Sequence, residues 1–209
     1  MANCRLCNEK TIDFGKFQDR EFVQCVVCQS VQVLPDYYLS VEAEKARYLL
    51  HDNDIRDPGY LDFVQPLLQK IKSEQNPQAS GLDYGCGTGP IIAAELEKAG
   101  FNISLYDPYF KNDTELLRRH YEFIICCEVM EHFQNPNSSF SKLSSLLQPD
   151  GKLYCKTALY NSAINFKNWH YKNDSTHVFF YTEKSLKWIA EHLNFSLVTI
   201  NPEVIIFTK

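Results

Sequence analysis

The sequence predicts an α/β fold, in which helices cover a mostly parallel, doubly wound sheet, and a small cysteine-rich module precedes it. Two observations predict the sheet. Residues 81–94 read as an apolar strand, a loop with three alternating glycines and an apolar helical run. A second strand, residues 102–106, ends in Asp107. The separate module is predicted from two C-x2-C pairs near the start of the chain.

These cysteines are Cys4 with Cys7 and Cys25 with Cys28, and seventeen residues separate the two pairs. Each pair forms a tight turn that points two thiolates at one position. Two such turns provide the closed tetrahedral site that structural zinc prefers. We therefore expect a zinc ribbon over residues 1–35, with a structural rather than a catalytic Zn²⁺. A pair of redox-active dithiols is the alternative, although neither pair lies in the strand-to-helix context of that chemistry.

Two helices are expected between the ribbon and the glycine loop, in a helical lead-in that covers residues 36–80. The first begins after Ser40, whose hydroxyl can cap it. The second covers residues 59–72, where apolar side chains recur at helical spacing. A polar, turn-rich loop separates the two helices. The rest of the chain, residues 81–209, is expected to form the α/β domain.

The segment from Asp83 to Pro90 has the pattern of a ligand-binding loop. Glycines let a ligand lie against bare backbone, and the helix that starts at Pro90 adds free N–H groups. The third glycine comes one residue too early for a dinucleotide fingerprint, and the lysine of a nucleoside-triphosphate loop is absent. Asp107 follows about 20 residues later, where an acid can accept hydrogen bonds from both ribose hydroxyls. The alternative is a tight turn followed by an ordinary surface aspartate.

This D-x-G-x-G-x-G pattern resembles the first motif of class I S-adenosylmethionine (SAM) methyltransferases. The resemblance implies a Rossmann-like sheet with SAM as the cofactor. One departure is expected, because only residues 108–122 separate two successive strands. The third strand of such a sheet is therefore short or missing, and one short helix, residues 114–120, fits there. The residues implied as cofactor-binding are Asp83, Gly85, Cys86, Gly87, Thr88, Gly89, Asp107, Pro108, Glu128 and His132.

A continuous apolar run, residues 123–127, is typical of a strand that is buried on both faces. Glu128 ends it. In class I methyltransferases this strand end lies beside the methionine part of SAM, so Glu128 is also a candidate catalytic residue. The E-x-x-E-H that starts at Glu128 is not the H-E-x-x-H of zinc proteases. His132 can equally be a histidine that is merely hydrogen-bonded at a helix start.

The last third of the chain completes the predicted sheet. Residues 137–147 read as a helix and residues 152–158 as a strand. Thr182 caps a helix over residues 183–192. Two final strands, 196–200 and 204–208, pair as a hairpin.

The irregular stretch from Trp169 to His177 is the expected acceptor site. Ligands of a doubly wound sheet sit outside the carboxyl ends of its strands, and this stretch follows such a strand. Its aromatic and titratable groups suit an aromatic or polar small molecule. We expect His170 or His177 to be a general base, because imidazole titrates near neutral pH. The expected substrate-binding residues are His51, Asn53, Trp169, Tyr171 and Asp174. The alternative is that the aromatic rings belong to the core and the histidines hold loop carbonyls.

Nearly the whole chain resembles bacterial zinc-ribbon class I methyltransferases, a family without a settled substrate. The resemblance implies methyl transfer from SAM and is silent about whether oxygen, nitrogen or carbon accepts the methyl group. Its further marks are Arg47-Tyr48, His51 to Asp54, Pro58-Gly59-Tyr60, Tyr106-Asp107-Pro108, Glu131-His132, and Asn168 to Asp174 with Thr176-His177.

Charge and composition favour a small-molecule acceptor over RNA. The net charge is −5, and the ribbon's Arg5, Lys10, Lys16 and Arg20 are balanced by four acids. A ribbon that binds RNA would present a basic face. An RNA methyltransferase and a non-catalytic SAM-binding or partner module stay as alternatives. No apolar run reaches the roughly 20 residues of a membrane span, and no signal core follows Met1, so we expect a cytoplasmic protein.

Overall fold

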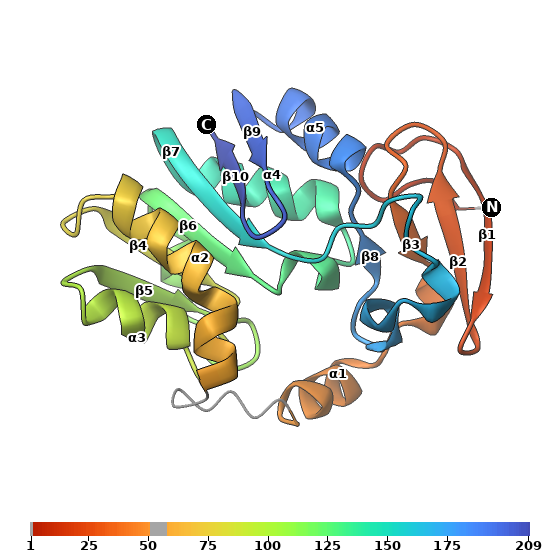
Figure 1. The fold of residues 1–209 in the computed structure, drawn as a ribbon, viewed down its shortest axis with the longest axis horizontal. Helices are drawn as coiled ribbons and strands as arrows, with labels where there is room; N and C mark the ends of the chain where they lie inside the picture. Colours follow the sequence, from red (N-terminus) through yellow and green to blue (C-terminus); the bar gives the residue numbers. More distant parts are fainter. Residues whose placement is uncertain (1, 51–57) are drawn as a thin grey trace.

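A large mixed sheet of six strands forms the body of the molecule, and a small antiparallel sheet of four strands lies beside it (Figure 1). The structure is a computed structural model that describes residues 2–50 and 58–209. The strand order is β5-β4-β6-β7-β10-β9 in the large sheet and β1-β2-β3-β8 in the small one.

The large sheet is parallel at its centre and antiparallel at one edge. Its apolar central strands are buried because helices cover both faces. The four parallel strands are β5 (Asn102–Tyr106), β4 (Ser80–Tyr84), β6 (Tyr121–Cys127) and β7 (Leu147–Lys156). The two antiparallel strands are β10 (Ile205–Thr208) and β9 (Leu197–Ile200).

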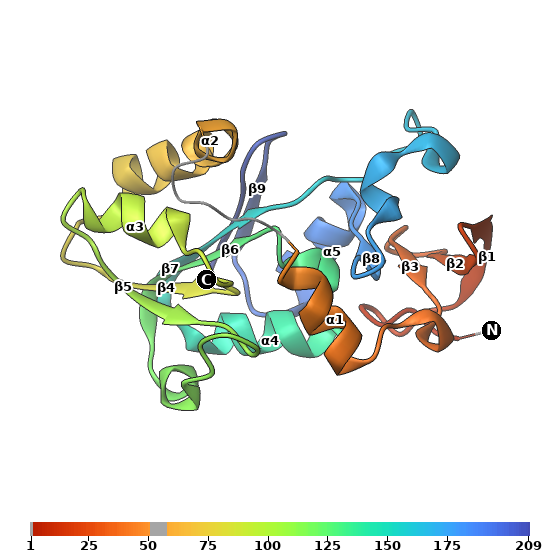
Figure 2. The same cartoon turned by 90° about the horizontal axis from the view of Figure 1, so that it is seen from below.

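Two helices pack on each face of the large sheet (Figure 2). On one face lie α2 (Pro58–Glu74) and α3 (Ile91–Glu97), whose buried apolar residues form one core cluster. On the other face lie α4 (Pro136–Leu146) and α5 (Glu183–His192), in a second core cluster. Thr182 caps α5 in a capping box with Ser185, which confirms the predicted start of that helix.

The third strand is missing from the sheet, as the sequence predicts. Between β5 and β6 the chain forms the 3₁₀ helix η2 (Thr114–Arg118) and an isolated bridge from Asp107 to Lys111. This helix is shorter and tighter than the helix expected over residues 114–120, because β6 begins at Tyr121 and leaves only residues 107–120 between the two strands. As a result β5 is the edge of the sheet and its carboxyl end is open on one side.

The N-terminal ribbon consists of β1 (Thr11–Phe17), β2 (Arg20–Cys25) and β3 (Val31–Val33). Its sheet is completed by β8 (Phe179–Phe180), which pairs with β3 and lies between the predicted acceptor stretch and α5, where no strand was expected. Two residues are too few to show strand periodicity. The division at residues 35 and 80 stays a prediction, and the small sheet includes one strand from beyond both boundaries.

Helix α1 (Val41–Tyr48) lies between the two sheets, on the side where the parallel strands end (Figure 2). Ser40 caps it, since its Oγ accepts a hydrogen bond from the backbone N–H of Ala43 over 3.2 Å. Among the described residues, no helix combines the length and the apolar character that crossing a membrane requires. The remaining turns of 3₁₀ helix are η1 (Pro35–Tyr37), η3 (Met130–His132), η4 (Phe166–Asn168) and η5 (His170–Asn173).

Candidate active site

A cavity of about 1080 Å³ opens outside the carboxyl ends of β4, β5 and β6. Its wall combines the loop after β4, the acid after β5 and the acid after β6, because parallel strands bring these ends to one edge. Helix α1 and the stretch 170–177 line the opposite side. The predicted cofactor residues in the wall are Gly85, Cys86, Gly87, Thr88, Gly89, Asp107, Pro108, Glu128 and His132.

The glycine loop takes a conformation that other residues resist. Gly85 and Gly87 have φ angles of +85° and +61°. A Cβ at Gly85 would stand 2.5 Å from a methyl carbon of Val129. Gly87 lines the cavity. Gly85 therefore fits the loop against the protein, whereas Gly87 belongs to the wall that faces the cavity.

Asp107 ties the loop to the end of β5. Its Oδ2 accepts a hydrogen bond from the N–H of Gly87 over 3.0 Å. Its Oδ1 accepts from the N–H groups of Tyr109 and Phe110, over 2.8 and 3.1 Å. The carboxylate is thus fixed in place at the cavity wall, where its remaining lone pairs are available to a ligand hydroxyl.

Asp83 lies behind the loop rather than among the cavity-lining residues. It is 5% exposed. Burial, and then the charge of Asp107, raise the pKa of Asp83 to about 7. Its predicted contact with the cofactor stays a prediction.

Helix α1 supplies polar groups from the far side of the cavity. Glu44 accepts hydrogen bonds from the hydroxyls of Tyr48 and Tyr109, over 2.7 and 2.9 Å. Arg47 forms an ion pair with Asp174, with 2.9 Å between Nη2 and Oδ2. These bonds connect α1 both to the turn after Asp107 and to the predicted acceptor stretch.

A buried group of hydrogen-bonded side chains forms the floor beside Glu128. The hydroxyl of Tyr171 donates to Glu131 Oε1 over 2.5 Å and lies 3.2 Å from Glu128 Oε2. Thr157, just after β7, donates to Glu131 Oε2 over 3.1 Å. Glu131 is fully buried. The predicted substrate-binding residue Tyr171 therefore acts here first as a partner of two carboxyl groups.

The two carboxyl groups are hard to ionise together. Burial and then the charge of Glu131 raise the pKa of Glu128 to about 8. Burial raises the pKa of Glu131 to about 7, although Tyr171 and Thr157 hydrogen-bond to its charged form. Near neutral pH this pair therefore holds a proton that can be exchanged with a ligand.

His132 and His177 lie side by side above these acids, with ring centroids 4.8 Å apart. The Nδ1 of His132 is 3.0 Å from the carbonyl oxygen of Thr176, and the Nδ1 of His177 is 2.7 Å from that of Tyr171. A carbonyl oxygen only accepts, so each Nδ1 carries the proton and each Nε2 is an unprotonated acceptor. Burial lowers the pKa of both imidazoles, that of His177 to about 3.

The other residues of the predicted acceptor stretch divide into three cases. Asp174 lines the cavity, and His170 lies at its rim with an exposed side chain. Trp169 is not among the lining residues and packs against Phe166 and Tyr171 in the aromatic cluster of the ribbon. Its placement favours packing over contact with a substrate. The predicted residues His51 and Asn53 lie outside the described part of the chain.

The ribbon holds the backbone of this stretch through Arg20. The buried guanidinium donates to the carbonyl oxygens of His177 and Asp174, over 3.1 and 3.2 Å, and to that of Lys172. Because both His177 and Asp174 line the cavity, the position of two site residues depends on a side chain from β2. From the sequence alone, Arg20 was considered only as one of the four cations of the ribbon.

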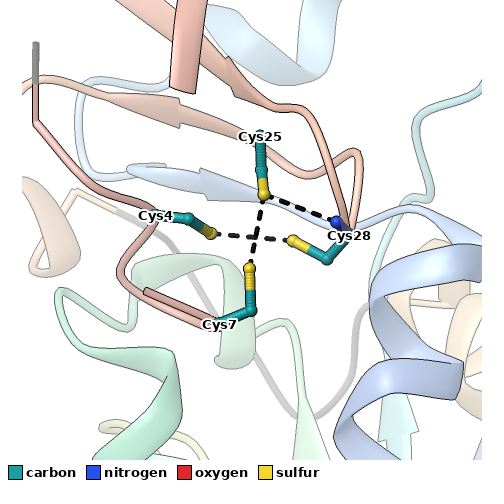
Figure 3. Close-up of side chains that lie close together, drawn as sticks. All are labelled: Cys4, Cys7, Cys25 and Cys28. Carbon is teal, nitrogen blue, oxygen red and sulfur yellow. Dashed lines mark hydrogen bonds between the residues drawn. The ribbon is translucent and has the colours of Figure 1, made fainter. Parts of the chain in front are cut away.

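The four ribbon cysteines converge as their spacing predicts, and Figure 3 shows their sulfur atoms pointing toward one another. Cys4 Sγ is 3.6 Å from Cys28 Sγ, and Cys7 Sγ is 3.3 Å from Cys25 Sγ. A tetrahedral ion with Zn–S bonds of about 2.3 Å would set sulfurs about 3.8 Å apart. The donor set therefore fits zinc, and four thiolates leave it no open position.

Some residues of the site were given no role from the sequence. Glu44, Tyr48 and Tyr109 line the cavity from helix α1 and from the turn after Asp107. Glu131 was noted only as part of E-x-x-E-H and as a mark of the resemblance. The one available signal was its three-residue spacing from Glu128, which puts both carboxyl groups near the end of β6.

Comparison with known proteins reveals one matching family and several similar proteins. The profile of the family described as "Methyltransferase domain" matches residues 53–200. A "Ubiquinone biosynthesis O-methyltransferase" of Rickettsia bellii is 29% identical over 141 residues, which cover 53% of this chain and 58% of that protein. One of the same name from Erwinia tasmaniensis is 22% identical over 103 residues, 49% of this chain and 41% of that protein. This chain thus spans about half the length of the curated relatives that it matches.

Solved structures share the fold. Magnesium protoporphyrin IX methyltransferase of Synechocystis, with bound SAH, superposes with a TM-score of 0.56 at 17% identity, covering 83% of this chain and 97% of that one. A 1,6-didemethyltoxoflavin-N1-methyltransferase of Burkholderia thailandensis superposes with a TM-score of 0.54 at 13% identity. The superposition covers 94% of this chain and 98% of that one. At these identities the likeness concerns the fold alone.

Proposed function

Because this chain belongs to the methyltransferase-domain family, we propose that it transfers the methyl group of SAM to a small molecule bound in the cavity. One observation carries the proposal: the same cavity is lined by the loop Gly85–Gly89 with Asp107, and by Glu128, His132 and His177. Its volume of about 1080 Å³ slightly exceeds the roughly 300–1,000 Å³ of small-molecule sites. A cofactor and a small acceptor can therefore occupy it together.

The cofactor would lie along the glycine loop. Backbone at Gly85 and Gly87 would contact its methionine part, and Asp107 would accept from the ribose hydroxyls. The turn Pro108–Phe110 lines the cavity next to Asp107 and would cover the adenine that a third strand normally supports. The SAH reported in two similar solved structures supports this assignment.

Methyl transfer needs the acceptor atom in line with the S–CH₃ bond of the cofactor. The acceptor's lone pair forms the new bond to carbon, the S–C electron pair stays on sulfur, and neutral SAH leaves. An acceptor hydroxyl or N–H also loses its proton. Among the predicted bases, the ionised form of Glu128 best suits that role, because its pKa of about 8 makes this carboxylate a stronger base than the imidazole of His177, whose pKa is about 3. His170 lies at the rim.

A small acceptor also fits the ribbon's charges better than RNA does. Arg5 donates to the carbonyl oxygens of Gln134 and Val178, and Arg20 is buried against the acceptor stretch. Two of the four ribbon cations are thus used inside the protein, which leaves Lys10 and Lys16 exposed. We propose a structural zinc in the ribbon, held by Cys4, Cys7, Cys25 and Cys28, which would fix β2 and β3.

The test combines cofactor binding with methyl transfer. Calorimetry should detect SAM and SAH binding to the purified protein. Incubation with methyl-labelled SAM and a cell extract should then label a low-molecular-weight product, with or without nuclease. Label that appears in RNA and disappears with nuclease would overturn the small-molecule proposal, and absent SAM binding would overturn the activity itself. The Glu128→Gln variant should bind SAH normally, but its rate of methyl transfer should fall by about 10²-fold or more. The His170→Ala variant should retain the methyl-transfer rate of the parent.

A further inference from the structure

The face of α1 that borders the cavity is polar, the reverse of what a helix on a protein surface usually shows. Glu44, Arg47 and Tyr48 recur at helical spacing, line the cavity and are half-buried. Ala43 and Ala46 lie on the opposite face and are exposed. A surface helix normally turns its apolar side chains toward the core. The inner face of α1 is therefore suited to a polar ligand rather than to packing.

Glu44 lies at the centre of this inner face and is held by two hydroxyl groups. Its Oε1 accepts a hydrogen bond from Tyr48 over 2.7 Å, and its Oε2 accepts one from Tyr109 over 2.9 Å. An ionised carboxylate oxygen has about two lone pairs, so one hydrogen bond to each oxygen does not saturate the group. The carboxylate is thus fixed at the cavity wall, where it offers acceptors to a ligand that has N–H or O–H donors.

Tyr109 connects Glu44 to the ribose end of the cofactor site. Its backbone N–H donates to Asp107 Oδ1 over 2.8 Å, while its hydroxyl, at the other end of the residue, donates to Glu44. The two carboxylates therefore stand at opposite ends of one tyrosine. A nucleoside with its ribose hydroxyls on Asp107 and its base along this side chain would direct the edge of the base toward Glu44.

Aromatic rings line the space between the two carboxylates. The ring centroids of Tyr109 and Phe110 are 6.2 Å apart, and those of Tyr48 and Tyr109 are 5.7 Å apart. All three rings line the cavity, and a purine stacks favourably on aromatic side chains. Because β5 is the edge of the large sheet, the turn after Asp107 and helix α1 provide the wall that a further strand would otherwise support.

We propose that Glu44 recognises the adenine of SAM by accepting a hydrogen bond from its exocyclic amino group, and that α1 covers the base in place of the missing third strand. Adenine presents an N–H donor at this position, whereas guanine and hypoxanthine present a keto oxygen, which only accepts. A carboxylate therefore selects adenine. The inference rests on the proposed function, because it assigns a part of the cofactor named there to a residue of α1.

Two ligands that differ at one position of the base test this assignment without a known acceptor. They are SAH and S-inosylhomocysteine, in which a keto oxygen replaces the amino group. Calorimetry should show that the parent binds SAH about 10–100-fold more tightly, as expected for a hydrogen bond to a charged group. In Glu44→Gln this preference should largely disappear, because an amide can accept from the amino group or donate to the keto oxygen.

Two control variants separate recognition of the base from attachment of the helix. Glu42→Gln, which changes an exposed carboxylate of α1, should keep the preference of the parent. Arg47→Gln breaks the ion pair between α1 and Asp174 but leaves Glu44 in place, so any loss of affinity should be shared by both ligands. A purely structural role of Glu44 would likewise weaken both ligands equally and leave their ratio unchanged.

Equal affinities of the parent for the two ligands would overturn the assignment of Glu44 and of α1, and so would a preference that Glu44→Gln retains. In both cases SAH still binds, so the proposed function stands. A parent that binds neither ligand would overturn both proposals.

Discussion

The backbone N–H of Gly87 donates a hydrogen bond to Oδ2 of Asp107 over 3.0 Å, which joins the loop after β4 to the end of β5. The two features that first indicated a cofactor site are therefore physically coupled. A change in Asp107 also alters the loop, and a side chain at residue 87 affects both. Predictions about this part of the site must separate binding from folding.

Gly85→Ala and Gly87→Ala should separate these effects. Both place alanine at a positive φ, which costs about 1 kcal/mol each. At Gly85 the new Cβ also overlaps Val129, so we expect a total loss of about 1–3 kcal/mol in unfolding free energy. At Gly87 the Cβ enters the cavity, so SAH affinity should fall at least about tenfold with a smaller loss of stability. Denaturant unfolding and calorimetry measure the two quantities, and equal effects of both variants would contradict this division.

Asp107→Asn should weaken SAH binding by about 10-fold or more. The amide oxygen can still accept from Tyr109 and Phe110, but the charged acceptor for the ribose hydroxyls is lost, and such bonds contribute about 1.5–3 kcal/mol. Calorimetry with SAH measures the loss. Calorimetry with methionine alone, which lacks the ribose, supplies the control, and a similar loss for both ligands would argue against a ribose contact.

Asp83→Asn should make the protein more stable at pH 8 and not at pH 4. The pKa of Asp83 is raised from 3.8 to about 7 by burial and by Asp107, so the folded state holds a proton that the unfolded state releases. Stability therefore falls as the pH rises from about 4 to 7, by at most about 4 kcal/mol. Thermal unfolding against pH should show this slope in the parent and a flatter one in the variant. Asp62→Asn, on the exposed face of α2, should leave the slope unchanged.

Arg20→Gln should loosen the stretch 172–177 without affecting the cofactor side. Three or more carbonyl oxygens lose a charged donor, so amide hydrogen exchange should accelerate there. SAH affinity should stay within about twofold, since Arg20 is not among the residues that line the cavity. Lys16→Gln, which removes an exposed cation from the neighbouring strand, is the matched control. Unchanged exchange in Arg20→Gln would mean that the stretch holds its own shape.

Removal of the proposed zinc should affect more than the ribbon itself. Chelation frees β2 and β3, and β3 pairs with β8. Hydrogen exchange should therefore increase in residues 4–33 and also in 178–182, while β6 stays protected. The double variant Cys25→Ser/Cys28→Ser should show the same pattern without chelator. Exchange confined to the first 33 residues would show that β8 keeps its structure without the ribbon strands.

Much of the α/β fold follows from local signals in the sequence. Strand β5 and helix α5 were predicted to the residue, because a glycine motif, an acid at a strand end and a threonine cap mark their limits. The class I methyltransferase fold is confirmed by the structure and by its likeness to solved structures. The missing third strand is confirmed by the strand order of the large sheet. Each of these features depends on residues close together in the chain.

The contacts between distant segments could not be predicted in the same way. The pairing of β3 with β8 involves two residues with no periodicity, and the role of Arg20 depends on which loop lies under it. His177 was expected to titrate near neutral pH, but burial lowers its pKa to about 3. That effect comes from surroundings that only the folded chain assembles.

The pairing of the ribbon with the last quarter of the chain also constrains the order of folding. Arg5 donates to the carbonyl oxygen of Val178, a contact that spans 173 residues, and the cysteine-rich turns precede that partner by most of the chain. During synthesis on the ribosome, the thiols are exposed long before β8 emerges, so they can bind the proposed zinc ion early. The small sheet is then completed only when nearly all the chain is available, and closing such a large loop is slow. The acceptor stretch, which lies just before β8, should therefore be among the last parts of the protein to reach its native structure.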